Sequence, residues 1–234
     1  MHRVDVFRVS YSAGDAKKLL VILLGAELLL VSAYILTHIV APGPTSEVLR
    51  NFLDVDREVS IPTWFSSAQL FALGPLLLLQ APRSKQLGRF LFILALGFIF
   101  LSMDEAAAIH DTIYRAAQRM NVPWIKGAEY LIWMAAYLLA AAIGLVIGWR
   151  PVFFAWRQFR REVVWIAAGE AIFVGGGIGI EILTHYLFHI AVDARFFLAV
   201  VAEEFFEMAG VSVMLYGFML LGIRLEQEKD GVLE

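Results

Sequence analysis

The segment Phe90–Phe100 reads FLFILALGFIF and contains no charged or hydrogen-bonding side chain. It continues directly into Leu101–Asp111, LSMDEAAAIHD, where the adjacent carboxylates Asp104 and Glu105 follow the apolar run. A helix needs about 20 mostly apolar residues to cross the hydrocarbon core of a bilayer. Together with its flanking residues this run meets that length, and similar apolar windows recur along the chain. The stretch therefore predicts a helical membrane protein that carries acids inside its spans.

The composition supports this fold class. The chain has 234 residues, of which 60% are hydrophobic and 18% charged, and its mean hydropathy is +0.71. Soluble domains contain about 45–50% apolar residues. Because apolar windows occupy nearly the whole length, a separate soluble domain has no room. We expect residues 1–234 to form one polytopic transmembrane domain.

We expect an all-α integral membrane protein, a bundle of six transmembrane helices. Segments that contain proline, glycine and charged residues separate the apolar runs. After the first span, residues 46–56 (SEVLRNFLDVD) place Val48, Leu49, Phe52 and Leu53 at helical spacing, which predicts a short helix in the membrane interface. The six expected spans are 18–41, 62–82, 87–118, 124–149, 162–190 and 195–224.

The basic residues predict the orientation in the membrane. Thirteen of the 19 lysine and arginine residues fall on the side that holds both termini, and six fall on the opposite side. Because cytoplasmic loops are enriched in basic residues, we expect both termini in the cytoplasm and the protein in a bacterial cytoplasmic (inner) membrane. The net charge of −3, without a basic patch, argues against nucleic-acid binding. The absence of cysteine excludes thiolate metal ligands.

The expected spans contain eight acids but no lysine or arginine well inside any of them. An isolated carboxylate at bilayer depth costs at least about 2–3 kcal/mol. Without a basic partner, such a group must be protonated, hydrogen-bonded to neutral groups or neutralised by a bound cation. The eight acids are Glu27, Asp104, Glu105, Glu170, Glu181, Glu203, Glu204 and Glu207.

Most of these acids, with several histidines, are expected in the outward-facing half of the bundle. Glu181, His185 and His189 share one face of the fifth span, because a helix turns about 100° per residue. Glu203 and Glu207 share a face of the sixth. Side chains four residues apart are about 6 Å apart and can bind one ion. We therefore expect a divalent metal ion (Zn, Mn or Fe) in this layer. The expected ligands are Glu181, His185, His189, Glu203, Glu204, Glu207 and His110.

Asp104 and Glu105 are expected to act as catalytic groups that transfer protons at this site. On a straight helix His110 points about 120° away from Asp104, so the two side chains meet only if the helix bends. The alternative for the whole layer is a hydrogen-bonded polar seam without metal, in which some acids are protonated or face the lipid headgroups. The acidic segment 54–58 (DVDRE) is interpreted as a solvated outer loop, because it lacks the full ligand pattern of a calcium loop.

Two acids, Glu27 and Glu170, are expected deeper, about 12–14 Å from the cytoplasmic ends of their spans. Between Glu170 and Glu181 runs VGGGIG, in which Gly175 and Gly179 have the spacing of closely packed helices. Local unwinding that exposes backbone carbonyls is the alternative interpretation.

A serine (Ser66 or Ser67), then Asp104, then the pair His185 and His189 follow one another along the chain. This order resembles that of the ceramidase-like membrane metallohydrolases. The resemblance implies a zinc ion held by histidine and aspartate with a serine nearby. It covers only these few residues, and the additional glutamates and the number of spans depart from the pattern of that family.

Three functions fit these features. The first is a metal-dependent membrane hydrolase that acts on a lipid or another amphiphile. The second is a cation or proton-coupled transporter in which Glu27 and Glu170 serve as inner stations. The third is an accessory subunit of a larger membrane complex, or a homo-oligomer, with the acids in structural hydrogen bonds. The hydrolase is favoured, because transition metals use imidazole and carboxylate ligands together.

Overall fold

The computed structural model describes residues 11–39, 43–120, 130–184 and 194–229 of the chain. Six helical segments in these ranges are long and apolar enough to cross a membrane, which confirms the all-α bundle of six spans. The elements are α1 (Ala13–Ile39), α2 (Pro44–Leu53), α3 (Ile61–Gln80), the short 3₁₀ turn η1 (Ala81–Arg83), α4 (Gly88–Ala107), α5 (Ile109–Met120), α6 (Tyr130–Gln158), α7 (Arg160–Val174), the π-helical segment η2 (Gly175–Ile180) and α8 (Ala194–Lys229).

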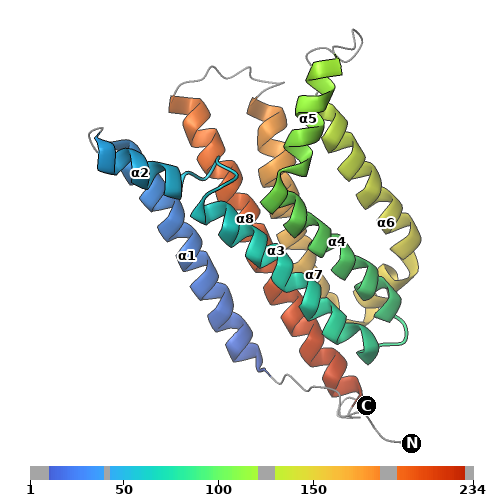
Figure 1. Ribbon diagram of the computed structural model, residues 1–234. Helices are drawn as coiled ribbons and strands as arrows, with labels where there is room; N and C mark the ends of the chain where they lie inside the picture. Colours follow the sequence, from blue (N-terminus) through green and yellow to red (C-terminus); the bar gives the residue numbers. More distant parts are fainter. Residues whose placement is uncertain (1–10, 40–42, 121–129, 185–193, 230–234) are drawn as a thin grey trace, which may run out of the picture.

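The central helix of the bundle is α8 (Figure 1). It packs against α7, α1 and α3, and α4 packs against the other side of α3. In the most apolar window of α8, 72% of the residues are buried, compared with 11% in that of α6. The main core joins Leu73 and Leu77 of α3, Leu91 of α4, and Val211 and Met214 of α8. The buried residues of α8 lie between several neighbouring helices.

Glycines allow α7 and α8 to approach closely. A Cβ atom on Gly169 of α7 would lie 2.6 Å from the backbone nitrogen of Met214. A Cβ atom on Gly210 of α8 would lie 2.5 Å from the backbone nitrogen of Phe173. Because neither helix has room for a side chain at these positions, the two backbones are in contact, as in other membrane helix pairs with small residues at the interface.

The expected single helix over residues 87–118 is wrong, because the chain changes direction at Ala108. Helix α4 ends at Ala107, α5 begins at Ile109, and Ala108 has a left-handed backbone with φ of 48°. This conformation costs an L-residue about 1–2 kcal/mol. Hydrogen bonds to Asp104 offset the cost, since its backbone oxygen accepts from the Ala108 N–H and its side chain accepts from the N–H of His110.

Other boundaries also differ from the expected ones. The fourth span was expected to end at residue 149, but α6 continues through Pro151 to Gln158. This last part of α6 is helical because it still has an apolar side, on which Ala155 joins the main core together with Phe159. The fifth span is helical as far as Thr184, and its expected continuation to residue 190 lies outside the described residues, as does the expected start of α6 at residue 124.

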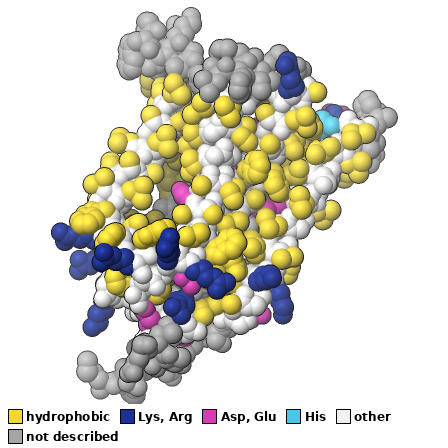
Figure 2. Space-filling view, turned by 180° about the vertical axis from the view of Figure 1, so that it is seen from behind, with side chains coloured by type: hydrophobic (Ala, Val, Ile, Leu, Met, Phe, Trp, Pro, Cys, Tyr) yellow, Lys and Arg dark blue, Asp and Glu magenta, His cyan; other side chains and the backbone are white. Residues whose placement is uncertain are grey.

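The short helix expected after the first span is present as α2. Its apolar side chains Val48, Leu49 and Phe52 are exposed, as expected for a helix that lies in the membrane interface. Because the chain crosses the bundle six times, α1 begins and α8 ends at the same end of the bundle (Figure 1). Lysine and arginine side chains gather in a band toward that end (Figure 2). We refer to the opposite end as the outer end.

Candidate functional site

The bend at Ala108 brings Asp104 and His110 together at the outer end of α4. The backbone N–H of His110 donates to Asp104 Oδ1 over 2.9 Å, and His110 Nδ1 lies 3.1 Å from Asp104 Oδ2. Asp104 is buried and His110 is partly exposed. The Asp104 carboxylate orients the His110 ring through Nδ1, and His110 Nε2 lies 4.0 Å from Asp111 Oδ1. His110 is thus oriented by one carboxylate and flanked by a second.

Aromatic residues of α6 cover one side of this pair. The Trp133 ring lies 5.3 Å from the His110 ring, and the Tyr137 ring lies edge-on to Trp133 at 5.8 Å. Tyr137 also interacts electrostatically with Asp104. These rings limit the positions that the imidazole can take and shield the carboxylate from the α6 side.

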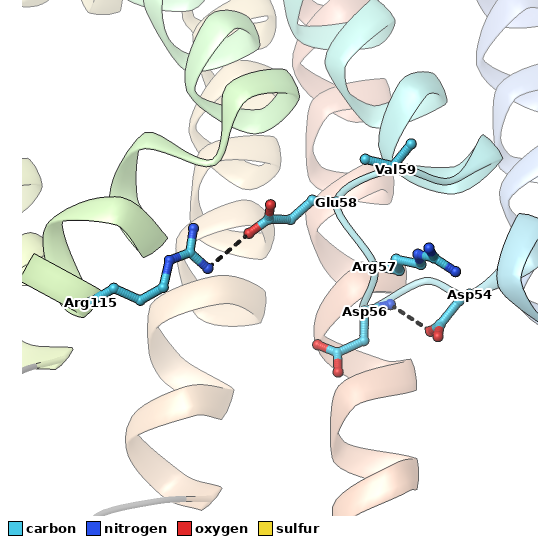
Figure 3. A pocket seen from close by; sticks show the side chains of 6 residues that line it. All are labelled: Asp54, Asp56, Arg57, Glu58, Val59 and Arg115. Carbon is cyan, nitrogen blue, oxygen red and sulfur yellow. Dashed lines mark hydrogen bonds and ion pairs between the residues drawn. The ribbon is translucent and has the colours of Figure 1, made fainter.

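A shallow pocket of about 440 Å³ lies between the α2–α3 loop and α5 (Figure 3). Arg115 Nη1 lies 3.5 Å from Glu58 Oε1 and 3.1 Å from Asp111 Oδ2, and so joins the loop to α5. The side chains that line the pocket are Asp54, Asp56, Arg57, Glu58, Val59 and Arg115. The loop, which was interpreted as simply solvated, therefore forms part of an acidic surface near the outer end of the bundle.

In the α2–α3 loop, the acidic side chains Asp54, Asp56 and Glu58 outnumber the single basic side chain Arg57. Burial, with Asp54 and Asp111 nearby, raises the pKa of Asp56 above its ordinary value. A hydrogen bond with Asp111, together with burial, raises the pKa of Glu58 despite the opposing effect of Arg115. The raised pKa values indicate that these carboxyls bind a proton more readily than an isolated aspartate or glutamate does.

The three acids of α8 lie on the inner side of this layer. Glu203, Glu204 and Glu207 are each partly exposed, and Glu207 interacts electrostatically with Asp104 and Glu105 of α4. Sequence reasoning placed all three glutamates in one layer with the α4 acids, and that grouping stays a prediction. The structure places Glu207 within electrostatic range of the α4 acids but not close enough for three of these groups to share one ion.

The Glu207 carboxylate lies against the backbone of η2. A Cβ atom on Gly177 would collide with Glu207 Oε1, and one on Gly176 would lie 3.1 Å from the Glu203 carbonyl oxygen. The glycines expected to make the close contact were Gly175 and Gly179, but a Cβ on Gly175 would have nothing within 4 Å. Gly176 is seven residues after Gly169, which faces α8, and so lies within about 20° of the same face, whereas Gly175 lies about 120° away from it.

Glu181 follows η2 directly and completes the described part of the layer. It is buried, with 9% of its surface exposed, and it interacts electrostatically with His110, Asp111 and Glu207. Its expected partners His185 and His189 lie outside the described residues. Within the ranges that the structure describes, no three histidine or acidic side chains lie close enough together to hold one metal ion.

The serines that suggested a resemblance to metallohydrolases have different surroundings. The Ser67 hydroxyl lies 2.9 Å from the Ser102 carbonyl oxygen, and the Ser102 hydroxyl donates to the Ser67 carbonyl oxygen over 2.8 Å. This pair ties α3 to α4. Ser66 is buried and interacts with Glu105. Of the two serines, Ser66 is the one that lies beside the acidic layer.

The two deeper acids, Glu27 and Glu170, lie in different environments. Glu27 of α1 is fully buried against α3 and α8, where it accepts hydrogen bonds from Gln69 and Ser212. Glu170 is on an exposed face of α7. The structure therefore does not bring Glu27 and Glu170 together. Gln69 and Ser212 were missed by sequence reasoning, although a polar amide or hydroxyl within an apolar span was the available signal.

The fold and these residues define a polytopic helical membrane protein that carries several acids and a histidine oriented by Asp104 near its outer end. Residues 20–221 match a protein family described as a domain of unknown function (DUF8692). The chain belongs to this family. No curated protein and no solved structure matches it significantly.

Proposed function

We propose that the protein is a metal-dependent hydrolase of a bacterial cytoplasmic membrane that acts on a lipid or another amphiphile at the outer end of its bundle. The observation that supports this proposal is the Asp104–His110 pair, in which the carboxylate orients an imidazole within electrostatic range of Glu105 and Asp111. The lysine and arginine band at the opposite end of the bundle supports an orientation in which this layer faces away from the cytoplasm.

In this proposal, His110 Nε2 and the carboxylates of Glu181 and Glu207 supply ligands, and because these described side chains are not close enough together to hold one ion in this structure, they move together when it binds. Asp104 is not a catalytic acid but the partner that orients His110. His185 and His189, which follow Glu181 at helical spacing in the sequence, are proposed as further ligands. Mixed imidazole and carboxylate ligands favour Zn, Mn or Fe over Mg or Ca.

The chemistry follows from these groups. A divalent ion supplies Lewis-acid activation of water at neutral pH. Glu105, which interacts with Ser66 and His110, would be the general base for a water and the general acid for the leaving group. An ester or amide bond of an amphiphile reaches such a site from the membrane interface, where α2 lies and where Val48, Leu49 and Phe52 are exposed.

Elemental analysis of the purified protein tests the metal site. We expect one transition metal ion per chain, lost in His110→Ala and retained in His38→Ala. His38 is a matched control because it also lies near the outer end of a span, but it stacks on Tyr34 and Phe197 rather than facing the acids. Asp104→Asn should weaken the metal affinity by about 10–100-fold. Equal metal content in His110→Ala and His38→Ala, or no stoichiometric metal in the wild type, would overturn the proposal.

Hydrolysis assays then test the reaction class. The metal-loaded protein in detergent micelles is offered ester-linked and amide-linked lipids, and the released fatty acid is measured. We expect turnover that requires Glu105 and that Glu170→Gln leaves unchanged. If the protein binds metal stoichiometrically but releases no product from either class of lipid, the proposed hydrolase activity is wrong. The proposed metal site would still stand.

A cation transporter is the second candidate, and the buried Glu27 favours it. A carboxyl held in the middle of the bundle by an amide and a hydroxyl is typical of sites that bind and release a cation during transport. Cation flux into vesicles that contain the protein distinguishes the transporter from the hydrolase. Uptake that is lost in Glu27→Gln, without hydrolysis by the wild type, would favour the transporter.

A further inference from the structure

Glu27, Gln69 and Ser212 form a buried polar group in the middle of the bundle. Gln69 Nε2 donates to Glu27 Oε1 over 2.8 Å and to Ser212 Oγ over 2.8 Å, and the Ser212 hydroxyl donates to Glu27 Oε1 over 2.5 Å. Glu27 and Ser212 are 0% exposed and Gln69 is 4% exposed. The three residues come from α1, α3 and α8, and Glu27 lies near the middle of α1, about 20 Å along the helix from Ala13.

Two oxygens of this group have no partner among the described residues. Glu27 Oε2 and Gln69 Oε1 are buried, and neither is within hydrogen-bonding distance of a donor. The Gln69 amide already uses its nitrogen for Glu27 and Ser212, so both free atoms are acceptors. They belong to a carboxyl and an amide that are joined by a 2.8 Å hydrogen bond. A buried acceptor that lacks a donor costs about 1–3 kcal/mol, and a carboxylate oxygen costs more.

The charge of the group is also uncompensated. Gln69 and Ser212 hydrogen-bond to the Glu27 carboxyl. No charged residue of the described helices interacts electrostatically with it. Among groups that face it from α3 and α8, there is therefore neither a lysine nor an arginine. An occupant with a single positive charge makes the group neutral, whereas a divalent ion leaves it with a net charge in the bilayer interior.

We infer that Glu27, Gln69 and Ser212 form a second site that holds one exchangeable monovalent cation, a proton or a sodium ion, separate from the acidic layer at the outer end. Oxygen atoms of a carboxyl, an amide and a hydroxyl are the ligands that a hard cation prefers. A proton on Oε2 neutralises the same carboxyl and supplies the missing donor. The site is independent of the proposed metal, because none of its three residues belongs to the outer layer.

Exchange of the occupant is compatible with the packing of α1. Only 17% of the most apolar window of α1 is buried, compared with 72% for α8. A helix with so small a buried surface separates from its neighbours at lower cost than a helix in the centre. A small movement of α1 relative to α3 and α8 exposes the Glu27 carboxyl without unfolding the core.

Infrared difference spectroscopy of the purified protein tests this inference, because a protonated carboxyl has a carbonyl band that the ionised form lacks. Spectra are recorded from mildly acidic to alkaline pH, in sodium and in choline buffers. We expect a carboxylic-acid band that titrates and that is lost in Glu27→Gln. Glu170→Gln, which removes the other deep acid, should leave it in place. Ser212→Ala should move the midpoint of its titration, whereas Ser67→Ala should not.

The two buffers identify the occupant. A titration that is the same in sodium and choline assigns the site to a proton. A band that appears in choline but is suppressed by sodium at the same pH assigns it to a sodium ion. The inference is overturned if Glu27→Gln folds normally and removes no band, or if the Glu27 band is unchanged at every pH in both buffers. Metal content of the outer layer is measured in parallel, so that a failure of this site is distinguishable from a failure of the proposed enzyme.

Discussion

His110 hydrogen-bonds to Asp104 through both its backbone and its side chain, although on a straight helix the two side chains would point about 120° apart. The contact exists because Ala108 adopts a left-handed conformation between them. The backbone bond caps the first turn of α5, and the side-chain bond orients the imidazole. One carboxylate thus caps the bend at the end of a membrane span and orients a histidine side chain.

The protonation of His110 should depend on Asp104. Burial opposes the charged imidazole, but the hydrogen bond and charge of Asp104, with Asp111 and Glu105 nearby, outweigh burial and raise the pKa of His110 above 6.5. A raised folded-state pKa stabilises the fold fully below the unfolded-state pKa, and this contribution is lost as pH rises through the folded-state pKa. In metal-free protein, we therefore expect the melting temperature to fall as the pH rises above about 6.5.

Asp104→Asn should remove this dependence and lower the pKa of His110. Histidine NMR shifts measured across a pH series report the pKa directly, and thermal unfolding at each pH reports the stability. Asp54→Asn is the control, because Asp54 does not affect the protonation of His110. An unchanged His110 titration in Asp104→Asn would show that the pair does not form.

The left-handed backbone at Ala108 predicts an unusual response to substitution. Ala108→Gly should be tolerated, because glycine adopts a positive φ without steric cost. Ala108→Val should destabilise the protein by about 1–3 kcal/mol, because a β-branched residue is strained in this region. Ala117→Val is the control, since Ala117 is also buried but lies within α5. Thermal unfolding in detergent measures all three, and equal losses for the two valine variants would contradict the expectation.

Substitution of Gly177 and of Gly169 should have different effects, the first on metal binding and the second on stability. A Cβ on Gly177 meets the end of the flexible Glu207 side chain, so Gly177→Ala should displace this carboxylate, reduce metal binding and change the stability little. A Cβ on Gly169 meets the backbone of α8, so Gly169→Ala should lower the melting temperature. Gly175→Ala, with open space around it, should change neither property. Metal content and thermal unfolding of the three variants separate the two roles.

Gln69 should contribute to stability through the Glu27 carboxyl. Gln69→Leu removes two buried hydrogen bonds and leaves Glu27 with fewer donors, so we expect a loss of about 1–3 kcal/mol. Gln118→Leu, on an exposed face of α5, is the control and should change the stability by less than about 0.5 kcal/mol. In Glu27→Gln, the added loss from Gln69→Leu should be smaller, because the hydrogen bond from Gln69 to the carboxyl is already absent.

The sequence alone determined the membrane class, the six spans and the interfacial helix α2. These features depend on the length and periodicity of apolar segments, which are properties of neighbouring residues and do not need the rest of the fold. The placement of most acids at the outer end also followed from the sequence, because depth along a helix is a count of residues. Helix boundaries were less certain, since α6 continues through Pro151 where a loop was expected.

Only the tertiary structure decided which side chains meet. Nothing in the run of alanines before Ile109 indicates that Ala108 takes a left-handed backbone, and the pairing of Asp104 with His110 depends on it. The contacts of Glu27 with Gln69 and Ser212 link three helices that are far apart in the sequence. Such contacts depend on how each helix is rotated and how closely it packs, and those are set by side chains on every neighbouring helix at once.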